Sequence, residues 1–234
     1  MYTYNLIETS GNAEFTAQSV VILQQKILNA IEQYDSCILG LSGGSTPRPV
    51  YEELGQRSDI DWQKVQLFLV DERYVPPDHA ESNQKLVRDT LLKHADVPPD
   101  QCYFPDTSLG IEDCVLAYAR SFVDLFAARP PDVMVLGLGP DGHTASLFPD
   151  SAGLDEAEKL VIATASPAGP RERVTLTLPV INASARIAAV VKGASKREKL
   201  RATLDSKTGS TALPLTLVRP DGTTWLVDRD AMGA

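Results

Sequence analysis

One histidine in this sequence lies where it could act as a base. His143 ends the run Gly137-Leu-Gly-Pro-Asp-Gly-His, which follows a very apolar segment. We place it at a strand-to-helix junction, where a helix N-terminus disfavours the protonated ring. Asp141 could orient the ring or stabilise the imidazolium. His79 and His94 have polar neighbours and are predicted at the surface. A lone histidine is more often structural, but this setting favours a water-activating base.

A second segment could bind an anion. Leu41-Ser-Gly-Gly-Ser-Thr-Pro joins a predicted strand to a predicted helix. Gly43 and Gly44 let the backbone approach a ligand, and free N–H groups at a helix N-terminus favour a phosphate. Further donors would be the hydroxyls of Ser42, Ser45 and Thr46. A tight turn with a capped helix explains the same residues equally well. A Walker A motif is absent, which disfavours nucleotide triphosphate hydrolysis.

Charged residues follow a third predicted strand. Asp71 and Arg73 flank Glu72, so the two share one side of the chain if the strand continues. Arg73 could hold an anionic group of a ligand. A surface salt bridge is the simpler interpretation of this segment taken alone.

Four other cations have two interpretations each. Lys192 and Lys196 follow a predicted strand, and Arg171 and Arg173 precede one. Each could close a phosphate site, and each could equally be a solvated charge.

Other chemistries fit less well. The glycine run also matches GxGxxG, but the next predicted strand ends without the acid that a dinucleotide ribose needs, and Pro140 makes the loop rigid. HExxH and a cysteine ligand set are absent, which disfavours zinc, and a serine triad is also the weaker interpretation. The three cysteines, Cys37, Cys102 and Cys114, are expected to be reduced thiols.

The elements that position these residues follow from apolar patterning. Short apolar runs predict buried strands, and apolar residues at spacings of three and four predict helices. Thr46 is the predicted N-cap and Pro47 the first residue of a helix through 54. In the helix over 17–31 we place Val21 on the apolar face, and in the helix over 111–128 we place Val123 there. The predicted strands are 2–8, 37–41, 65–70, 133–136, 160–165, 174–178, 187–191 and 224–227, and the other predicted helices are 83–93 and 196–204.

Alternation of strands and helices predicts an α/β fold. We expect a mostly parallel, Rossmann-like sheet with helices on both faces and a single domain over residues 1–234. Ligands of such sheets bind beyond the carboxyl ends of the strands. Three predicted strands end in the motifs described above, so we expect the motifs to lie along one edge. This convergence is the main functional signal.

Composition limits the partners. The 234 residues include 22 Lys and Arg against 31 Asp and Glu, a net charge of −9, which disfavours nucleic acid and polybasic membrane binding. No apolar run reaches the length of a membrane span and no signal peptide is evident, so we expect a cytoplasmic protein. A small cationic pocket remains compatible with this charge.

The motifs, in this order, resemble those of the glucosamine-6-phosphate isomerase/6-phosphogluconolactonase family. The resemblance rests on residues 41–47, Val70-Asp-Glu-Arg with Ser82-Asn83, residues 137–149, residues 172–179 and Gly193-Ala-Ser-Lys196. It covers nearly the whole chain. The deaminase branch carries a glutamate shortly after the histidine, and Thr144-Ala-Ser-Leu-Phe-Pro has none. The resemblance therefore favours the lactonase branch.

The resemblance implies hydrolysis of 6-phospho-D-glucono-1,5-lactone to 6-phosphogluconate, a step of the oxidative pentose phosphate pathway. It implies no metal or organic cofactor. The expected partner is this small sugar-phosphate lactone, with no nucleic acid or membrane, and the expected state is a monomer or a weak dimer. Rivals are an amino-sugar-phosphate deaminase and a non-catalytic sugar-phosphate sensor.

By the same resemblance, His143 takes a proton from water, and Asp141 and Asp71 orient the ring, the water or the sugar. Arg73 is a candidate for oxyanion stabilisation. The selection among Arg73, Arg173, Lys192 and Lys196 for the phosphate stays open. The residues assigned to phosphate binding are Ser42, Gly43, Gly44, Ser45, Thr46, Arg73, Arg173 and Lys196.

Overall fold

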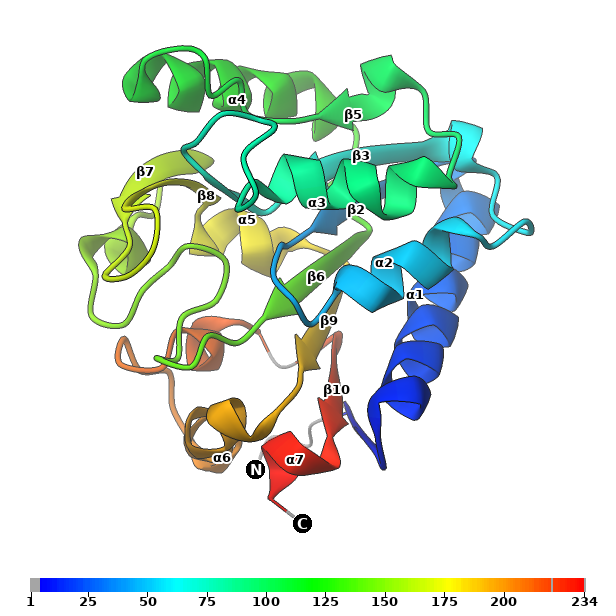
Figure 1. The fold of residues 1–234 in the computed structure, drawn as a ribbon. Helices are drawn as coiled ribbons and strands as arrows, with labels where there is room; N and C mark the ends of the chain where they lie inside the picture. The colour runs from blue at the N-terminus through cyan, green and yellow to red at the C-terminus, as the bar shows by residue number, and fades with distance from the viewer. Residues whose placement is uncertain (1–4, 220, 234) are drawn as a thin grey trace.

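A seven-stranded sheet forms the centre of the molecule (Figure 1). The computed structural model describes residues 5–219 and 221–233. The strand order is β1-β10-β9-β6-β2-β3-β5, and every neighbouring pair is parallel. The strands are β1 Asn5–Thr9, β2 Cys37–Leu41, β3 Val65–Leu69, β5 Cys102–Tyr103, β6 Val133–Gly137, β9 Arg186–Val191 and β10 Thr223–Asp228. The predicted parallel α/β sheet is confirmed; residues 2–4 of the first predicted strand lie outside the described residues.

Three other strands form a separate antiparallel sheet. β4 Asp71–Arg73 pairs with β8 Glu172–Leu176, which pairs with β7 Val161–Ala165. The apolar runs predicted these last two strands, but they do not join the parallel sheet. Strand β8 also lies two residues earlier than predicted. Val174 and Leu176 on β8 and Val161 on β7 are buried against the main core, so the small sheet covers part of one face.

Helices cover both faces of the central sheet. One face carries α1 Asn12–Tyr34, α2 Arg48–Gly55 and α3 Asn83–Asp89. The other carries α4 Ile111–Leu125, α5 Leu178–Ala183, α6 Arg197–Asp205 and α7 Arg229–Met232. Neighbouring strand residues alternate between the faces, since Ile38 packs with the second group of helices and Leu39 with the first. Burial on both faces explains the continuous apolar runs of the strands.

Three helix predictions need correction. The first residue of α2 is Arg48, and Pro47 rather than Thr46 is its N-cap, without a side-chain cap bond. The predicted helix over 83–93 is broken at Thr90, whose hydroxyl donates to the Leu86 carbonyl. Val21 and Val123, placed on apolar faces, are 54% and 62% exposed, because neighbouring residues of the same helices fill the core contacts.

The strand order reverses between β2 and β6. From β2 the chain proceeds outward to β3 and β5, and from β6 it proceeds outward in the other direction to β9 and β10. The register pairs Leu39 with Val133 and Gly40 with Met134, and no later pair joins these strands. Adjacent strands that separate at a switch point leave a crevice at their carboxyl ends. The site described below occupies this crevice.

Two further predictions concern the whole chain. Within the described residues, no helix is both long enough and apolar enough to cross a bilayer. Cys37 and Cys114 are buried, Cys102 is half-buried, and all three are free thiols, as predicted. The single domain over residues 1–234 stays a prediction.

Candidate active site

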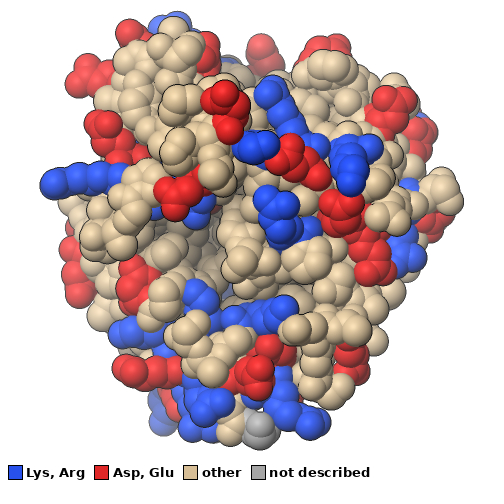
Figure 2. All heavy atoms as spheres, in the orientation of Figure 1, with Lys and Arg blue, Asp and Glu red and all other residues tan. Residues whose placement is uncertain are grey.

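A cavity of about 430 Å³ opens at the carboxyl ends of β2, β6 and β9. The three motifs expected to converge all contribute to it. Figure 2 shows a hollow on this face with Lys and Arg side chains near its margin, although acidic residues are spread over the rest of the surface. The polar lining residues are Ser42, Ser45, Thr46, Asp71, Arg73, Asn83, His143, Lys192, Ser195 and Lys196.

The serine-glycine loop presents backbone donors to this cavity. Within the described part of the chain, the amides of residues 43–46 donate no hydrogen bond to another protein group. Gly44 has φ +106°, a conformation that favours glycine. Any Cβ on Gly43 would lie 1.7 Å from Asn83 Oδ1. Gly44 is therefore required by the backbone conformation and Gly43 by the close approach of the Asn83 side chain, and the free amides form a place for an anion ahead of α2.

The hydroxyl of Ser42 has a structural partner. Ser42 Oγ donates to the Val135 carbonyl at 2.8 Å, bridging β2 and β6 where their pairing ends. The Tyr51 hydroxyl donates to the Ser42 carbonyl at 2.8 Å. The expectation that the Ser42 hydroxyl donates to a phosphate is thus not supported by this geometry. Ser45 and Thr46 make no side-chain hydrogen bond with the described residues, so their hydroxyls keep that capacity.

His143 and Asp141 form a close pair. His143 Nδ1 lies 2.5 Å from Asp141 Oδ1, and the His143 amide donates to the same oxygen at 3.2 Å. Burial opposes the charge on Asp141, but the neighbouring His143 charge and these hydrogen bonds outweigh it. The pKa of the Asp141 carboxyl is accordingly below its usual value. With Nδ1 engaged, Nε2 is the ring nitrogen left for proton transfer.

The surroundings of His143 differ from the prediction in one respect. Residues 138–151 contain no helix, so the expected helix N-terminus beside the ring is wrong. The loop closes on itself instead, with the Gly139 amide donating to the His143 carbonyl at 2.7 Å. Proline and glycine at 140 and 142 favour this tight turn over a helix. The partner of the ring is therefore Asp141 and not a helix N-terminus.

A glycine makes room for the pair. A Cβ built on Gly139 would lie 2.2 Å from His143 Nδ1 and 2.5 Å from Asp141 Oδ1. At Gly137 the same Cβ would meet nothing within 4 Å. Of these two glycines of the GxGxxG-like run, Gly139 therefore serves the histidine–aspartate geometry.

Asp71 is held by side chains that the sequence interpretation did not assign to the site. Ser146 Oγ donates to Asp71 Oδ2 at 2.7 Å, and Asn83 Nδ2 donates to the Asp71 carbonyl at 2.8 Å. Both partners are about 1% exposed. Ser146 lies in the histidine loop and Asn83 begins α3, so Asp71 connects two motifs. Their only sequence signal was membership in the motifs that carry the resemblance.

Glu72 points to the other side of β4 and anchors α3. It accepts hydrogen bonds from the amides of Arg73, Asn83 and Gln84 at 2.7 Å each and from the Ser82 hydroxyl at 3.0 Å. Burial raises the pKa of Glu72, and these four hydrogen bonds act in the opposite direction. The carboxylate fixes the start of α3 and, through it, Asn83.

The candidate cations separate into two groups. Arg73, Lys192 and Lys196 line the cavity. Burial lowers the pKa of Lys196, although Asp141 acts in the opposite direction. Arg173 is not a lining residue. It is 7% exposed, and its Nε donates to the Pro170 carbonyl at 2.8 Å.

Arg173 instead lies beside Arg73 on the neighbouring strand of the small sheet. The two are register partners on β8 and β4, and burial together with the Arg73 charge lowers the pKa of Arg173. Arg73 reaches the cavity while its Nη1 donates to the Glu81 carbonyl at 2.6 Å. Arg73 and Lys196 line the cavity and Arg173 does not, so the structure does not support the predicted contact of Arg173 with phosphate.

Other predicted features can be placed as well. His79 and His94 are exposed, as expected, and His94 lies 2.8 Å from Glu52. No group of three or more potential metal-ligating side chains occurs among the residues that the structure describes.

Fold and cavity together define a doubly wound α/β protein with a histidine–aspartate pair and an anion-binding loop in one cleft. The family model described as glucosamine-6-phosphate isomerases/6-phosphogluconolactonase matches residues 10–227. The chain belongs to this family.

Named relatives of this chain support the lactonase branch of the family. The chain is 35% identical over 223 residues to a 6-phosphogluconolactonase of Nostoc sp., covering 92% of this chain and 91% of the relative. It is 34% identical to the Thermotoga maritima 6-phosphogluconolactonase, covering 94% and 95%. A crystal structure of a 6-phosphogluconolactonase from Thermotoga maritima superimposes with a TM-score of 0.85 at 32% identity, covering 95% and 98%.

Proposed function

We propose that this chain hydrolyses 6-phospho-D-glucono-1,5-lactone to 6-phosphogluconate. The observation that carries the proposal is that His143 and the free amides of residues 43–46 line one cavity of about 430 Å³. A base and an anion site in one cleft suit a substrate with an ester at one end and a phosphate at the other. Named lactonase relatives at 34–35% identity support this assignment.

In this mechanism His143 Nε2 accepts a proton from water as the water oxygen attacks C1 of the lactone. Asp141, 2.5 Å from Nδ1, holds the ring and stabilises the imidazolium. The tetrahedral intermediate then collapses and the bond between C1 and the ring oxygen breaks. His143 returns the proton to that oxygen, leaving a hydroxyl and a carboxylic acid, which ionises in solution.

Asp71 and Arg73 have proposed roles beside the reacting carbon. Asp71, held by Ser146, accepts hydrogen bonds from sugar hydroxyls or the water. Arg73 stabilises the negative charge that develops on the carbonyl oxygen. These two side chains leave the same side of β4, as their spacing predicts.

The phosphate end is proposed to lie at the serine-glycine loop. Amides of residues 43–46 and the hydroxyls of Ser45 and Thr46 donate to its oxygens, and Lys196 neutralises charge. A continuous assay on freshly generated lactone, with spontaneous opening subtracted, tests the proposal. Turnover indistinguishable from the spontaneous rate would reject it.

Two comparisons separate this activity from its rivals. A deaminase would release ammonia from glucosamine 6-phosphate, whereas we expect none. A non-catalytic sensor would bind the phosphorylated ligand without accelerating lactone opening.

Lys196→Met should raise KM for the phosphorylated lactone and leave kcat/KM for glucono-1,5-lactone nearly unchanged. Equal effects on both substrates would remove Lys196 from the phosphate site.

The proposal also covers the state and place of the protein. We expect a monomer, or at most a weak dimer, acting in the cytoplasm on this small molecule. Sedimentation velocity over a range of protein concentrations measures the oligomeric state.

A further inference from the structure

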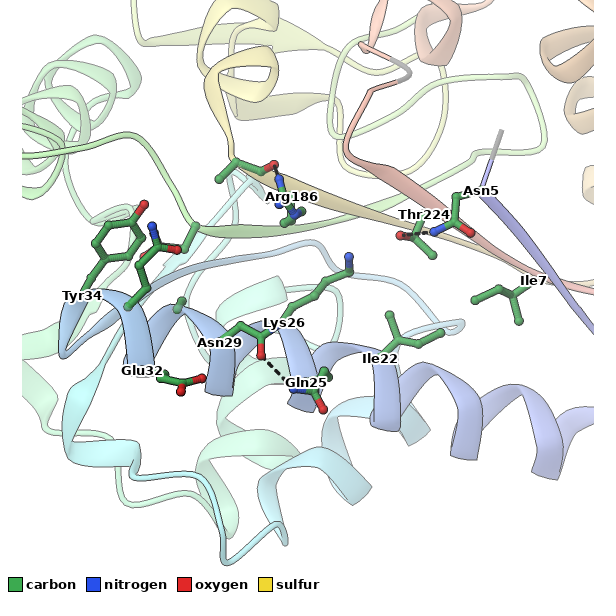
Figure 3. A pocket seen from close by; sticks show the side chains of 14 residues that line it. Asn5, Ile7, Ile22, Gln25, Lys26, Asn29, Glu32, Tyr34, Arg186 and Thr224 are labelled. Atoms are coloured by element: carbon green, nitrogen blue, oxygen red, sulfur yellow. Dashed lines mark hydrogen bonds between the residues drawn. The ribbon is translucent and has the colours of Figure 1, made fainter. Parts of the chain in front are cut away.

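A second, larger cavity lies at the opposite end of the sheet. We call it the basal cavity: about 870 Å³ between α1 and the first residues of β1, β9 and β10 (Figure 3). Arg186 begins β9 at this cavity, while Val190 on the same strand lines the candidate active site. Four strand residues span about 13 Å. The basal cavity is therefore separate from the catalytic cleft.

Two cations face this cavity, and neither forms an ion pair with a described residue, although Asp221 lines an adjoining pocket with both of them. Figure 3 shows Lys26 extending from α1 toward the side of the cavity that carries Arg186. Lys26 makes no hydrogen bond or ion pair with any described residue, and burial and the Arg186 charge lower its pKa. The Arg186 guanidinium donates only to its neighbour, the Ala185 carbonyl, at 2.9 Å.

The two carboxylates that line the basal cavity, Glu32 and Asp132, are engaged or turned away, and Asp221 lines only the adjoining pocket. Asp132 accepts from the Ile38 amide at 2.7 Å and pairs with Arg129 at 3.0 Å. Glu32 is exposed and lies on the side of α1 away from Lys26 and Arg186 in Figure 3. Half-buried Lys26 and exposed Arg186 thus face the cavity without an ion-pair partner among the described residues, and an anion would be favoured between them.

Neutral donors and an apolar wall complete the cavity. Asn29 accepts from Gln25 through Oδ1 at 2.7 Å, which leaves its Nδ2 group to donate. The Thr224 hydroxyl accepts from Asn5 at 3.2 Å and keeps its own proton. Ile7 and Ile22 form an apolar side. Hydrogen-bond donors on one side of the basal cavity and aliphatic side chains on another match a phosphate group joined to a carbon skeleton.

We propose that the basal cavity is a second ligand site that binds a small phosphate monoester. Lys26 and Arg186 contact the phosphate, Asn29 and Thr224 donate to its oxygens, and the organic part lies toward Ile7 and Ile22. This site is independent of the lactone chemistry proposed above.

The test is a titration of the full chain with glycerol 3-phosphate, followed by amide NMR at constant ionic strength. We expect saturable shifts at residues 185–187 and 224, separate from any at residues 43–46. Lys26→Met and Arg186→Met should each weaken the first set about tenfold or more, as expected for loss of a charged hydrogen bond. Lys207→Met, an exposed lysine elsewhere, should leave it unchanged.

Three outcomes of the glycerol 3-phosphate titration would overturn the proposal. These are shifts confined to residues 43–46, shifts at the basal cavity that do not saturate, and equal curves for wild type and Lys26→Met. Inorganic phosphate and glycerol serve as further probes. Binding of glycerol as tightly as glycerol 3-phosphate would also exclude a phosphate site. Because residues 43–46 report separately, failure of the lactonase assignment and failure of this proposal are distinguishable.

Discussion

The reacting end of the site depends on an imidazole with only one free nitrogen. Asp141 holds Nδ1 at 2.5 Å, and the ring also lies against Phe148 with centroids 5.0 Å apart. Both contacts limit rotation of the ring. A base that is already oriented loses little freedom when the substrate binds.

Loss of the proposed base, His143, should be the largest single effect on catalysis. His143→Ala is expected to lower kcat by about 10²–10⁴-fold, the range for loss of a general base. Initial rates at saturating lactone measure it. His94→Ala is the matched control, since the His94 ring pairs with Glu52 at the surface, away from the cavity. A His143→Ala variant within a few-fold of wild type would contradict the assignment.

The two glycines before the histidine allow a sharper comparison. Gly139→Ala places a methyl group against His143 and Asp141, so we expect the pair to separate and kcat to fall about 100-fold, as for a misplacement of about 1 Å. Gly137→Ala meets open space and should change kcat by less than about twofold. Equal losses in both variants would show that the pair does not need the space at Gly139.

The lowered pKa of Asp141 predicts a dependence of stability on pH. A carboxyl whose pKa is depressed on folding contributes stability above its unfolded value, near 3.8, and loses it as pH falls further. Asp141→Asn should therefore lower the urea midpoint at neutral pH. The gap to wild type should close below about pH 3.8. Asp124→Asn, exposed on α4, is the control; a gap that persists in acid would contradict the argument.

At the scale of elements, one carboxylate holds the connection between β4 and α3. Glu72 accepts three amides and a hydroxyl, and Ser82 also accepts from the Lys85 amide as the N-cap of α3. The element that carries Asn83 into the cavity is thus fixed from outside the cavity. Loss of the Glu72 carboxylate should therefore lower both the stability of the protein and its affinity for substrate.

Glu72→Gln should destabilise the protein because an amide cannot accept all of these bonds. We expect a loss of about 3 kcal/mol in the free energy of unfolding, hence a Tm lower by about 6–12 °C. Differential scanning calorimetry measures it. Glu158→Gln, an exposed glutamate, should shift Tm by less than about 2 °C. If both variants melt together, the Glu72 contacts do not stabilise the start of α3.

Patterning predicted elements well where a strand is buried on both faces. Cys37–Leu41 was predicted residue for residue because all five residues are buried. Apolar patterning could not predict the antiparallel sheet, because Asp71-Glu72-Arg73 is polar. The pairing of this segment with β8 depends on contacts with residues about a hundred positions away in the chain. The break at Thr90, where the backbone leaves the helical conformation, leaves no periodic signal.

The site was predictable in its position and less so in its detail. Parallel strands bring their carboxyl ends to one edge, so the motifs after β2 and β6 had to meet there. Which side chains face the cavity depends on packing. Ser42 turns to Val135, Arg173 to Pro170, and Asn83 enters from α3. These orientations follow from tertiary contacts and not from spacing.

At the scale of the molecule, the prediction of one domain can be tested by cooperativity. The two apolar clusters lie on opposite faces of the same strands. Urea unfolding should therefore give one transition, with coincident curves from fluorescence of the two tryptophans and from far-UV circular dichroism. Two separated transitions would indicate independently folding parts.

The pairing of the outermost strand has a consequence for biosynthesis. β1 lies at the edge of the sheet, where its only strand partner is β10, and Asn5 bonds Thr224 across 219 positions of the chain. A ribosome makes β1 well before β10. The earlier strand therefore waits without its partner while the intervening chain is made, and its backbone is available to chaperones or to neighbouring nascent chains. Correct completion of the sheet must await release of β10.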